Sequence, residues 1–301
     1  MDSETTDRAE PTAPLAERPV VSVVVACNGA PGALERCLDA VARQLANTEL
    51  VVCSATEQPE ELRRRYPDAV WLVREGALVP VLWRDGISRA RGELVALTIS
   101  PMVPRGDWLD ALRASLADAD AIGGAIEPAA GLRAADRAEC WCRYARDMLP
   151  FEPATSLELA GDNAGYRRER LLAVEETWLD GFWEPEVHRA LAAAGGRLRH
   201  EPSVVVEMGS SAGAAAFLRQ RLAHGREYGR TRGSRSGAAA NLARIGLSVA
   251  VPFILVARTL REAARRGRRR SLLPVLPHVL LFDTAWAAGE ALGHVDALRA
   301  R

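Results

Sequence analysis

The feature that most constrains the fold is a regular alternation of short apolar runs and amphipathic segments in the first third of the chain. Val20–Ala26 (VVSVVVA) is rich in β-branched residues and ends at the turn-forming pair Asn28-Gly29, which is typical of a strand buried on both faces. The same alternation predicts helices over 32–45, 57–66 and 80–90 and further strands over 49–53, 70–74 and 93–98. Four strands alternating with helices predict an α/β fold with a parallel sheet. Such sheets bind nucleotides at the carboxyl ends of their strands.

The sequence from 106 to 208 is less regular but continues the same α/β pattern. Helices are predicted over 108–116, 133–148, 168–174 and 186–194, and strands over 121–126 and 203–207. A Gly-Asp-Asn turn is expected at 161–163.

After Met208 the composition changes, and a helical region is expected over 209–301. Phe217–Arg235 is rich in arginine, and two apolar stretches, Ile245–Ala257 and Ser271–Phe282, flank the basic run Arg265–Arg270. These stretches hold 13 and 12 residues, whereas a straight bilayer span needs about 20. The flanking arginines favour an interfacial or re-entrant membrane hairpin over a pair of buried helices. Each stretch could also cross a bilayer if it extended past one flanking charge, Arg258 or Asp283, whose side chain would reach back to the membrane surface.

Composition excludes several classes of protein. The 39 basic residues, all arginine, balance 39 acidic ones, so a dedicated nucleic-acid binder is not expected. The first 18 residues lack the apolar core of a signal peptide and are expected to form a disordered leader. Five scattered cysteines indicate reduced thiols, and the spacing of Cys140 and Cys142 is too short for a common zinc site.

Five segments, in order, resemble inverting family 2 glycosyltransferases of the GT-A fold. They are Ser22–Gln44 (SVVVACNGAPGALERCLDAVARQ), Gly86–Leu97 (GISRARGELVAL), Val103–Leu112 (VPRGDWLDAL), Gly161–Leu172 (GDNAGYRRERLL) and Gly181–Val206 (GFWEPEVHRALAAAGGRLRHEPSVVV). The resemblance implies a GT-A domain over 19–208, with a nucleotide-binding half (19–105) and an acceptor half (106–208). It also implies a nucleotide-diphosphate sugar as donor, and a lipid-linked or cell-surface glycan as acceptor. The cytoplasmic face of the cell membrane is then the expected location.

The sequence departs from the family at two donor-side positions. The Asp-x-Asp motif that holds Mn²⁺ or Mg²⁺ in the family is replaced by Ile99-Ser100-Pro101, so the usual ligands of a hard cation are absent. The acidic pair expected after the second strand is replaced by Cys53-Ser54. We therefore expect either a transferase that works with little or no metal ion, with Mn²⁺ or Mg²⁺ possible but without its usual ligands, or a catalytically inactive scaffold that binds a glycan or a partner.

The resemblance places the catalytic carboxylate at Glu184, with Glu186 as the second candidate. Both precede or begin a helix, where acidic residues are also common for purely structural reasons. The remaining candidates for donor or acceptor binding are Asn28, Cys53, Ser54, Arg84, Ser100, Asp162, Asn163, Gln220 and Arg221. Arginines are included because guanidinium groups neutralise a leaving diphosphate by bidentate contacts. Most single arginines, however, are expected to be solvated.

Overall fold

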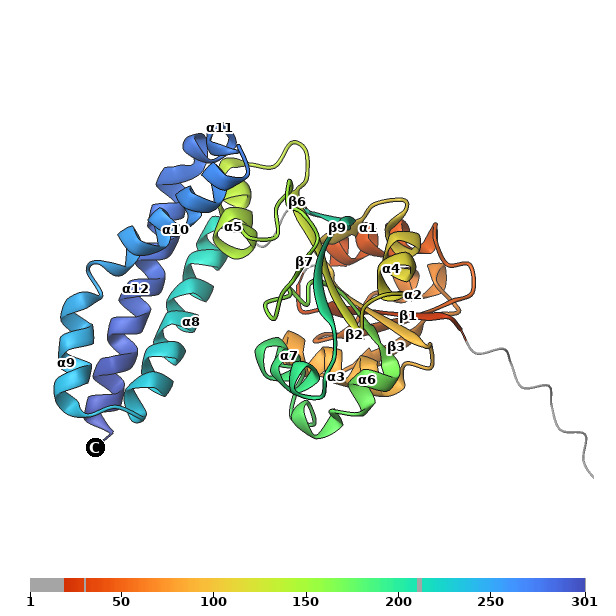
Figure 1. Cartoon of the computed structure of the whole chain (residues 1–301), viewed down its shortest axis with the longest axis horizontal. Coiled ribbons are helices and arrows are strands. Elements are labelled where there is room, and N and C mark those ends of the chain that lie inside the picture. Colours follow the sequence, from red (N-terminus) through yellow and green to blue (C-terminus); the bar gives the residue numbers. More distant parts are fainter. Residues whose placement is uncertain (1–18, 30, 210–212, 301) are drawn as a thin grey trace, which may run out of the picture.

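The computed structural model describes residues 19–29, 31–209 and 213–300, so the leader expected at 1–18 lies outside the described residues. The described chain forms an α/β part and, beside it, a group of long helices (Figure 1). The α/β part is built on one sheet of nine strands among these residues, in the order β3-β2-β1-β4-β8-β6-β9-β5, with β7 paired to β9.

The first half of the α/β part confirms the predicted alternation. Its strands are β1 (Val21–Cys27), β2 (Thr48–Ser54), β3 (Val70–Val73) and β4 (Leu94–Ile99). The pairs β1–β2, β2–β3 and β1–β4 are parallel, and the helices between them are α1 (Pro31–Ala42), α2 (Glu60–Arg65) and α3 (Val79–Arg89). All seven residues of β1 are buried, as expected for a central strand covered by helices on both faces.

In the second half, the expectation of a mostly parallel sheet is wrong. The elements are β5 (Met102–Pro104), α4 (Trp108–Leu116), β6 (Ala121–Pro128), α5 (Ala134–Tyr144), β7 (Ala154–Thr155), β8 (Asn163–Arg167), α6 (Arg168–Leu172), α7 (Glu184–Ala193) and β9 (Leu198–Met208). Strand β8 lies between β4 and β6 and is antiparallel to both. Its sequence, NAGYR, has no β-branched residue, so its extended conformation depends on the two neighbouring strands.

The C-terminal helices are α8 (Ala214–Ser234), α9 (Ala238–Leu247), α10 (Val251–Arg265), the short α11 (Arg269–Leu272) and α12 (Leu276–Arg299). The first apolar stretch, 245–257, is divided between α9 and α10, which meet at an angle of 61°. Helix α12 lies between α8 and the α9–α10 pair (Figure 1). The five cysteines, all within the described residues, are free thiols, as predicted.

Glycines bring α8 and α12 unusually close together. A Cβ atom at Gly225 would lie 2.1 Å from the carbonyl oxygen of Trp286, and one at Gly289 would lie 2.1 Å from that of Leu222. Gly229 and Gly293 make equally close backbone contacts, at 2.2 and 2.1 Å. The G-x-x-x-G spacing on both helices was a readable sequence signal for this contact.

Candidate active site

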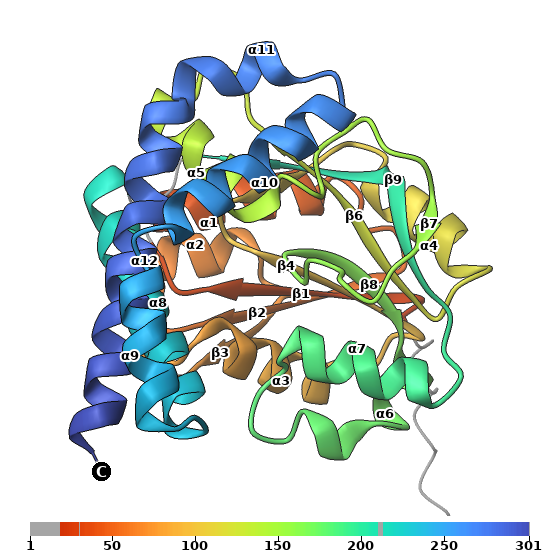
Figure 2. The same ribbon diagram turned by 60° about the vertical axis from the view of Figure 1, so that its left-hand side comes forward.

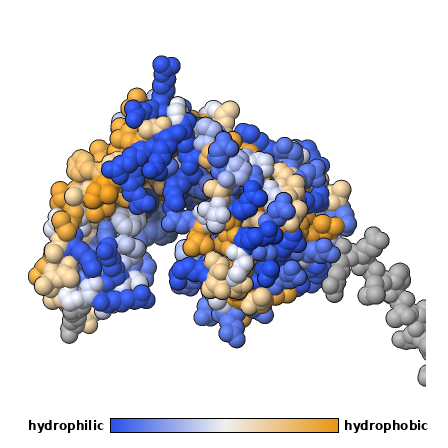
Figure 3. Space-filling view, in the orientation of Figure 1, coloured by the Kyte–Doolittle hydropathy of each residue, from blue (hydrophilic) through white to orange (hydrophobic). Residues whose placement is uncertain are grey.

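The carboxyl ends of the parallel strands lie on the side of the sheet that faces the C-terminal helices (Figure 2). A hollow separates the α/β part from these helices on the molecular surface (Figure 3). Four of the predicted site residues, Asn28, Cys53, Ser54 and Ser100, lie along this edge. The register pairs Cys27 with Ser54, and the Ser100 amide donates to the Ala26 carbonyl at 2.9 Å. The structure therefore brings these four residues to one edge.

Only Asn28 of these four is exposed. Cys53 and Ser54 are fully buried, and Ser100 is 2% exposed. The Ser54 hydroxyl accepts a hydrogen bond from Gln58 Nε2 at 2.8 Å. Where the family carries an acidic pair, this chain therefore has a buried serine that is hydrogen-bonded within the protein. No carboxylate is present there to bind a nucleotide.

A second group of predicted residues meets at the end of β4. Glu184 is the first residue of α7, and its Oε1 accepts a hydrogen bond from the Gly161 amide at 3.3 Å. The Thr98 hydroxyl donates to the Asp162 carbonyl at 3.0 Å, which fixes the same loop to β4. A Cβ at residue 161 would lie 2.9 Å from both Glu184 Oε1 and the Trp83 ring. Glycine at this position therefore lets the carboxylate approach the sheet.

Helix α5 holds the carboxylate of Asp162. Its Oδ2 accepts hydrogen bonds from Arg143 Nη2, at 3.0 Å, and from the Tyr144 hydroxyl. Burial raises the pKa of Tyr144 well above its usual value, so the hydroxyl stays protonated and donates. Arg143 also pairs with Glu139 at 3.4 Å. Sequence reasoning assigned no site role to Arg143 or Tyr144, because only the tertiary structure brings α5 beside the 161–163 loop.

Glu184 has the electrostatic properties of a general base. Burial, and then the negative charge of Asp162, raises its pKa to about 7. A carboxylate with a pKa near the working pH accepts a proton efficiently and is still ionised in a useful fraction of molecules. A cavity of about 350 Å³ opens beside it and is lined by Arg143, Arg146, Asp147, Glu158, Glu184 and His188. That volume falls in the range of small-molecule sites, about 300–1,000 Å³.

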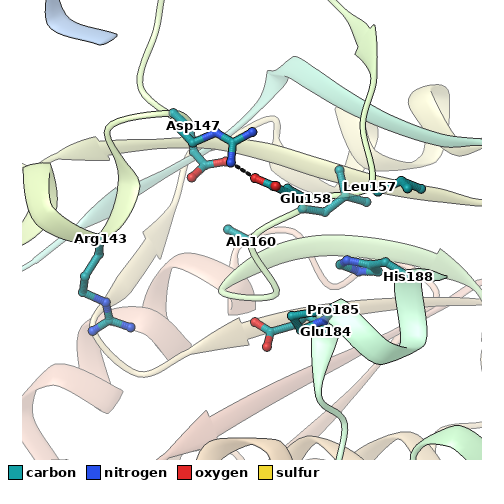
Figure 4. A pocket seen from close by; sticks show the side chains of 10 residues that line it. Arg143, Asp147, Leu157, Glu158, Ala160, Glu184, Pro185 and His188 are labelled. Carbon is teal, nitrogen blue, oxygen red and sulfur yellow. Dashed lines mark ion pairs between the residues drawn. The ribbon is translucent and has the colours of Figure 1, made fainter. Parts of the chain in front are cut away.

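Figure 4 shows the carboxylate of Glu184 pointing toward the side of the cavity where Arg143 lies. Arg146 and Glu158, which also line the cavity, form an ion pair with each other. His188 is buried, and its ring lies 2.8 Å from the Tyr166 hydroxyl. Burial lowers its pKa to about 4, so His188 is neutral at physiological pH and supports the cavity wall.

Other predicted residues lie outside the cavity lining. Glu186 is exposed on α7, two residues from Glu184. Arg84 pairs with Asp85 at 2.6 Å and donates to the Leu179 carbonyl at 2.9 Å. Gln220 is exposed on α8, whereas Arg221 turns toward α12 and pairs with Asp283 at 3.0 Å. Arg221 is therefore committed to helix packing.

The prediction that Asn163 binds a ligand is not supported by its surroundings. The side chain is fully buried. Its Nδ2 donates to the carbonyls of Ala125 and Val204 at 2.8 and 2.9 Å, and its Oδ1 accepts from Trp108 Nε1 at 2.8 Å. This amide joins β8 to the neighbouring strands, and it has no surface left for a sugar.

The residues at the end of β4 do not fit a divalent cation. Thr98 uses its hydroxyl internally, Ile99 and Ser100 are buried, and hard cations prefer several carboxylate or carbonyl oxygens. Across residues 19–29, 31–209 and 213–300, no group of three or more His, Cys, Asp or Glu side chains is arranged to hold a metal ion. The positive charge beside Glu184 is instead a guanidinium, that of Arg143, which lines the same cavity.

Comparison with known proteins identifies the class of fold. No protein-family model and no curated protein match the sequence. A solved structure does: the mannosyltransferase PcManGT from Pyrobaculum calidifontis, in complex with GDP-Man and Mn²⁺, is 21% identical with a TM-score of 0.53. The match covers 94% of this chain and 88% of that chain, so it extends into the C-terminal helices. The chain has a glycosyltransferase-type α/β fold.

Proposed function

We propose that the protein is an inverting glycosyltransferase of the family 2 type. It moves a sugar from a nucleotide-diphosphate donor to a hydroxyl of a lipid-linked or cell-surface glycan. The observation that carries this proposal is Glu184, a partly buried carboxylate with a pKa of about 7 beside a cavity at the end of β4. The likeness to a solved mannosyltransferase supports the same class of chemistry.

In the proposed reaction, the ionised carboxylate of Glu184 accepts the proton of the acceptor hydroxyl. The acceptor oxygen forms a bond to the anomeric carbon while the bond from that carbon to the diphosphate oxygen breaks. The electron pair of the broken bond leaves with the diphosphate, and the configuration at the anomeric carbon inverts. Asp162 raises the proton affinity of Glu184 through its negative charge.

The leaving diphosphate needs a positive charge, and Arg143 is the best-placed candidate. Its guanidinium borders the cavity that contains Glu184 and is oriented by Asp162 and Glu139. A guanidinium binds phosphate oxygens by paired hydrogen bonds. We assign this role to Arg143 rather than to Arg84 or Arg221, which bond to other parts of the chain. The proposed reaction uses no metal ion.

The test compares Glu184→Gln with Glu186→Gln, which lies on the same helix but is exposed. Nucleotide sugars are first screened by calorimetry, with Mn²⁺ or Mg²⁺ and again with a chelator, and the donor that binds is used for turnover. We expect donor binding without metal in both variants and loss of transfer only in Glu184→Gln, by at least about 100-fold. Full turnover in Glu184→Gln would refute the assignment.

One observation favours an inactive scaffold as the second candidate. The positions of the family's donor-side acids are occupied by the buried residues Cys53, Ser54 and Ser100, and the Ser54 hydroxyl is hydrogen-bonded to Gln58. A chain that binds no nucleotide or nucleotide sugar, with or without metal, would support the scaffold. Binding of a glycan alone would then identify what it recognises.

A further inference from the structure

The helices α9 and α10 expose an unusual amount of apolar surface where they meet. Leu242, Leu247, Val249, Phe253 and Ile254 are between 56% and 76% exposed, and we call this group the α9–α10 apolar surface. Figure 3 shows apolar residues gathered on the flank of the helices that lies away from the α/β part. Apolar patches of this kind mark binding surfaces in soluble chains.

The charge around this surface is strongly positive. Residues 238–282 contain eight arginines and one carboxylate, Glu262, and two of these arginines, Arg266 and Arg268, are bonded to the 127–150 region instead. Along the outer side of α10, exposed Ile254 is followed at helical spacing by Arg258, Arg261 and Arg265, which are also exposed. An apolar surface bordered by arginines matches the interface of a bilayer that contains anionic lipids.

Length and composition alone would also allow α12 to cross a membrane. The segment Arg269–Arg299 is long and apolar enough for a span. Its buried side, however, carries Asp283, Glu290 and His294, which are 3%, 6% and 0% exposed. Asp283 pairs with Arg221 of α8 at 3.0 Å, and His294 Nδ1 lies 3.1 Å from Asn241 Oδ1 of α9.

Helix α8 cannot separate from α12 without breaking these contacts. Their backbones touch at Gly225, Gly229, Gly289 and Gly293, and two ion pairs, Arg221–Asp283 and Arg232–Glu290, join them. Helix α8 carries five arginines and one glutamate over 21 residues. A spanning α12 would draw these charges into hydrocarbon, where each costs several kcal/mol.

We infer that the C-terminal helices bind the cytoplasmic surface of an anionic bilayer in plane, through the α9–α10 apolar surface, and do not cross it. Helix α8 then faces water and the hollow of the candidate site, while the arginines of α10 reach lipid phosphates. This inference does not depend on catalysis. We prefer a bilayer to a second copy of the chain as the partner of the α9–α10 apolar surface. A two-fold contact would place the arginines of both copies at one interface, where they would repel each other.

The experiment uses the full chain, purified without detergent, and measures its flotation with lipid vesicles in the absence of nucleotide. One vesicle set is phosphatidylcholine alone, and the other is phosphatidylcholine mixed with phosphatidylglycerol. We expect binding to the anionic set and release by an alkaline carbonate wash, as for a protein that lies on the surface. Retention after the wash would overturn the in-plane arrangement, and lack of binding to anionic vesicles would overturn the proposal.

Matched variants separate the apolar contribution from the charge contribution. Val249→Ser with Phe253→Ser should weaken binding by about tenfold or more, because each side chain loses its burial in lipid. The control is Leu78→Ser with Leu179→Ser, whose side chains are 58% and 55% exposed on the α/β part, and it should bind as the parent does. Arg258→Gln with Arg261→Gln should weaken binding about tenfold on anionic vesicles only.

Circular dichroism of each variant checks that the helices remain folded. Gel filtration without vesicles tests the competing occupant. Two results together would assign the surface to a second copy and refute binding to a bilayer. Val249→Ser with Phe253→Ser would disrupt a dimer, and the same substitutions would leave vesicle binding unchanged. Loss of transfer in Glu184→Gln with unchanged flotation would leave this inference intact, so the two proposals fail separately.

Discussion

The raised pKa of Glu184 makes a prediction about stability that requires no substrate. Folding moves the pKa of this carboxyl from its ordinary value of 4.5 to about 7. The folded state therefore binds the proton more tightly than the unfolded state. Each pH unit between the two values corresponds to about 1.36 kcal/mol, so ionised Glu184 destabilises the fold by about 3 kcal/mol.

The sign of the pH dependence follows from linkage. Below pH 4.5 the carboxyl is protonated in both states, and Glu184 has no destabilising effect. Between pH 4.5 and 7 the unfolded state ionises first, so stability falls as the pH rises, and above 7 the loss is complete. Glu184→Gln cannot ionise, so relative to the parent it should gain about 3 kcal/mol of unfolding free energy from pH 4.5 to pH 8.

The assay is denaturant unfolding followed by tryptophan fluorescence at a series of pH values, on the parent, Glu184→Gln and Glu186→Gln. Trp83 lies beside the loop that carries Gly161, so the signal includes the site itself. The exposed Glu186 serves as control, and its variant should follow the parent at every pH. Parallel curves for the parent and Glu184→Gln would refute the reasoning, because they would mean that the carboxyl titrates alike in both states.

Three further predictions follow from neighbouring contacts. Asp162→Asn removes the negative charge beside Glu184, so the acid limb of the pH–activity profile should move to lower pH, and an unmoved limb would contradict this coupling. Arg143→Ala should lower the transfer rate by about 100-fold or more, a loss that Arg143→Lys, which keeps the charge, should partly restore. Gly229→Ala would place a Cβ 2.2 Å from the Glu290 carbonyl oxygen, and thermal unfolding should reveal a loss of about 1–3 kcal/mol. The control Gly246→Ala, in α9 and with open space around the added methyl, should be neutral or stabilising.

Much of the fold was predictable because local pattern and tertiary environment agree in the first half of the chain. Val21–Cys27 is rich in β-branched residues and fully buried, and the helices between the strands carry their apolar residues at the expected spacing. The second half was harder, since Asn163–Arg167 has little intrinsic preference for a strand. Its conformation comes from hydrogen bonds to β4 and β6, partners that are remote in sequence.

The sequence by itself determined the α/β class and the apolar, arginine-bordered character of the C-terminal region, and its resemblance to family 2 glycosyltransferases singled out Glu184. The first two are local information, carried by periodicity and composition. Only the tertiary structure decided what surrounds Glu184: Asp162 close enough to raise its pKa, and Arg143 and Tyr144 brought from α5. It also decided that Asn163 and Arg221 serve packing. Charge interactions and burial depend on distance in space, and distance in space is not encoded in any one segment.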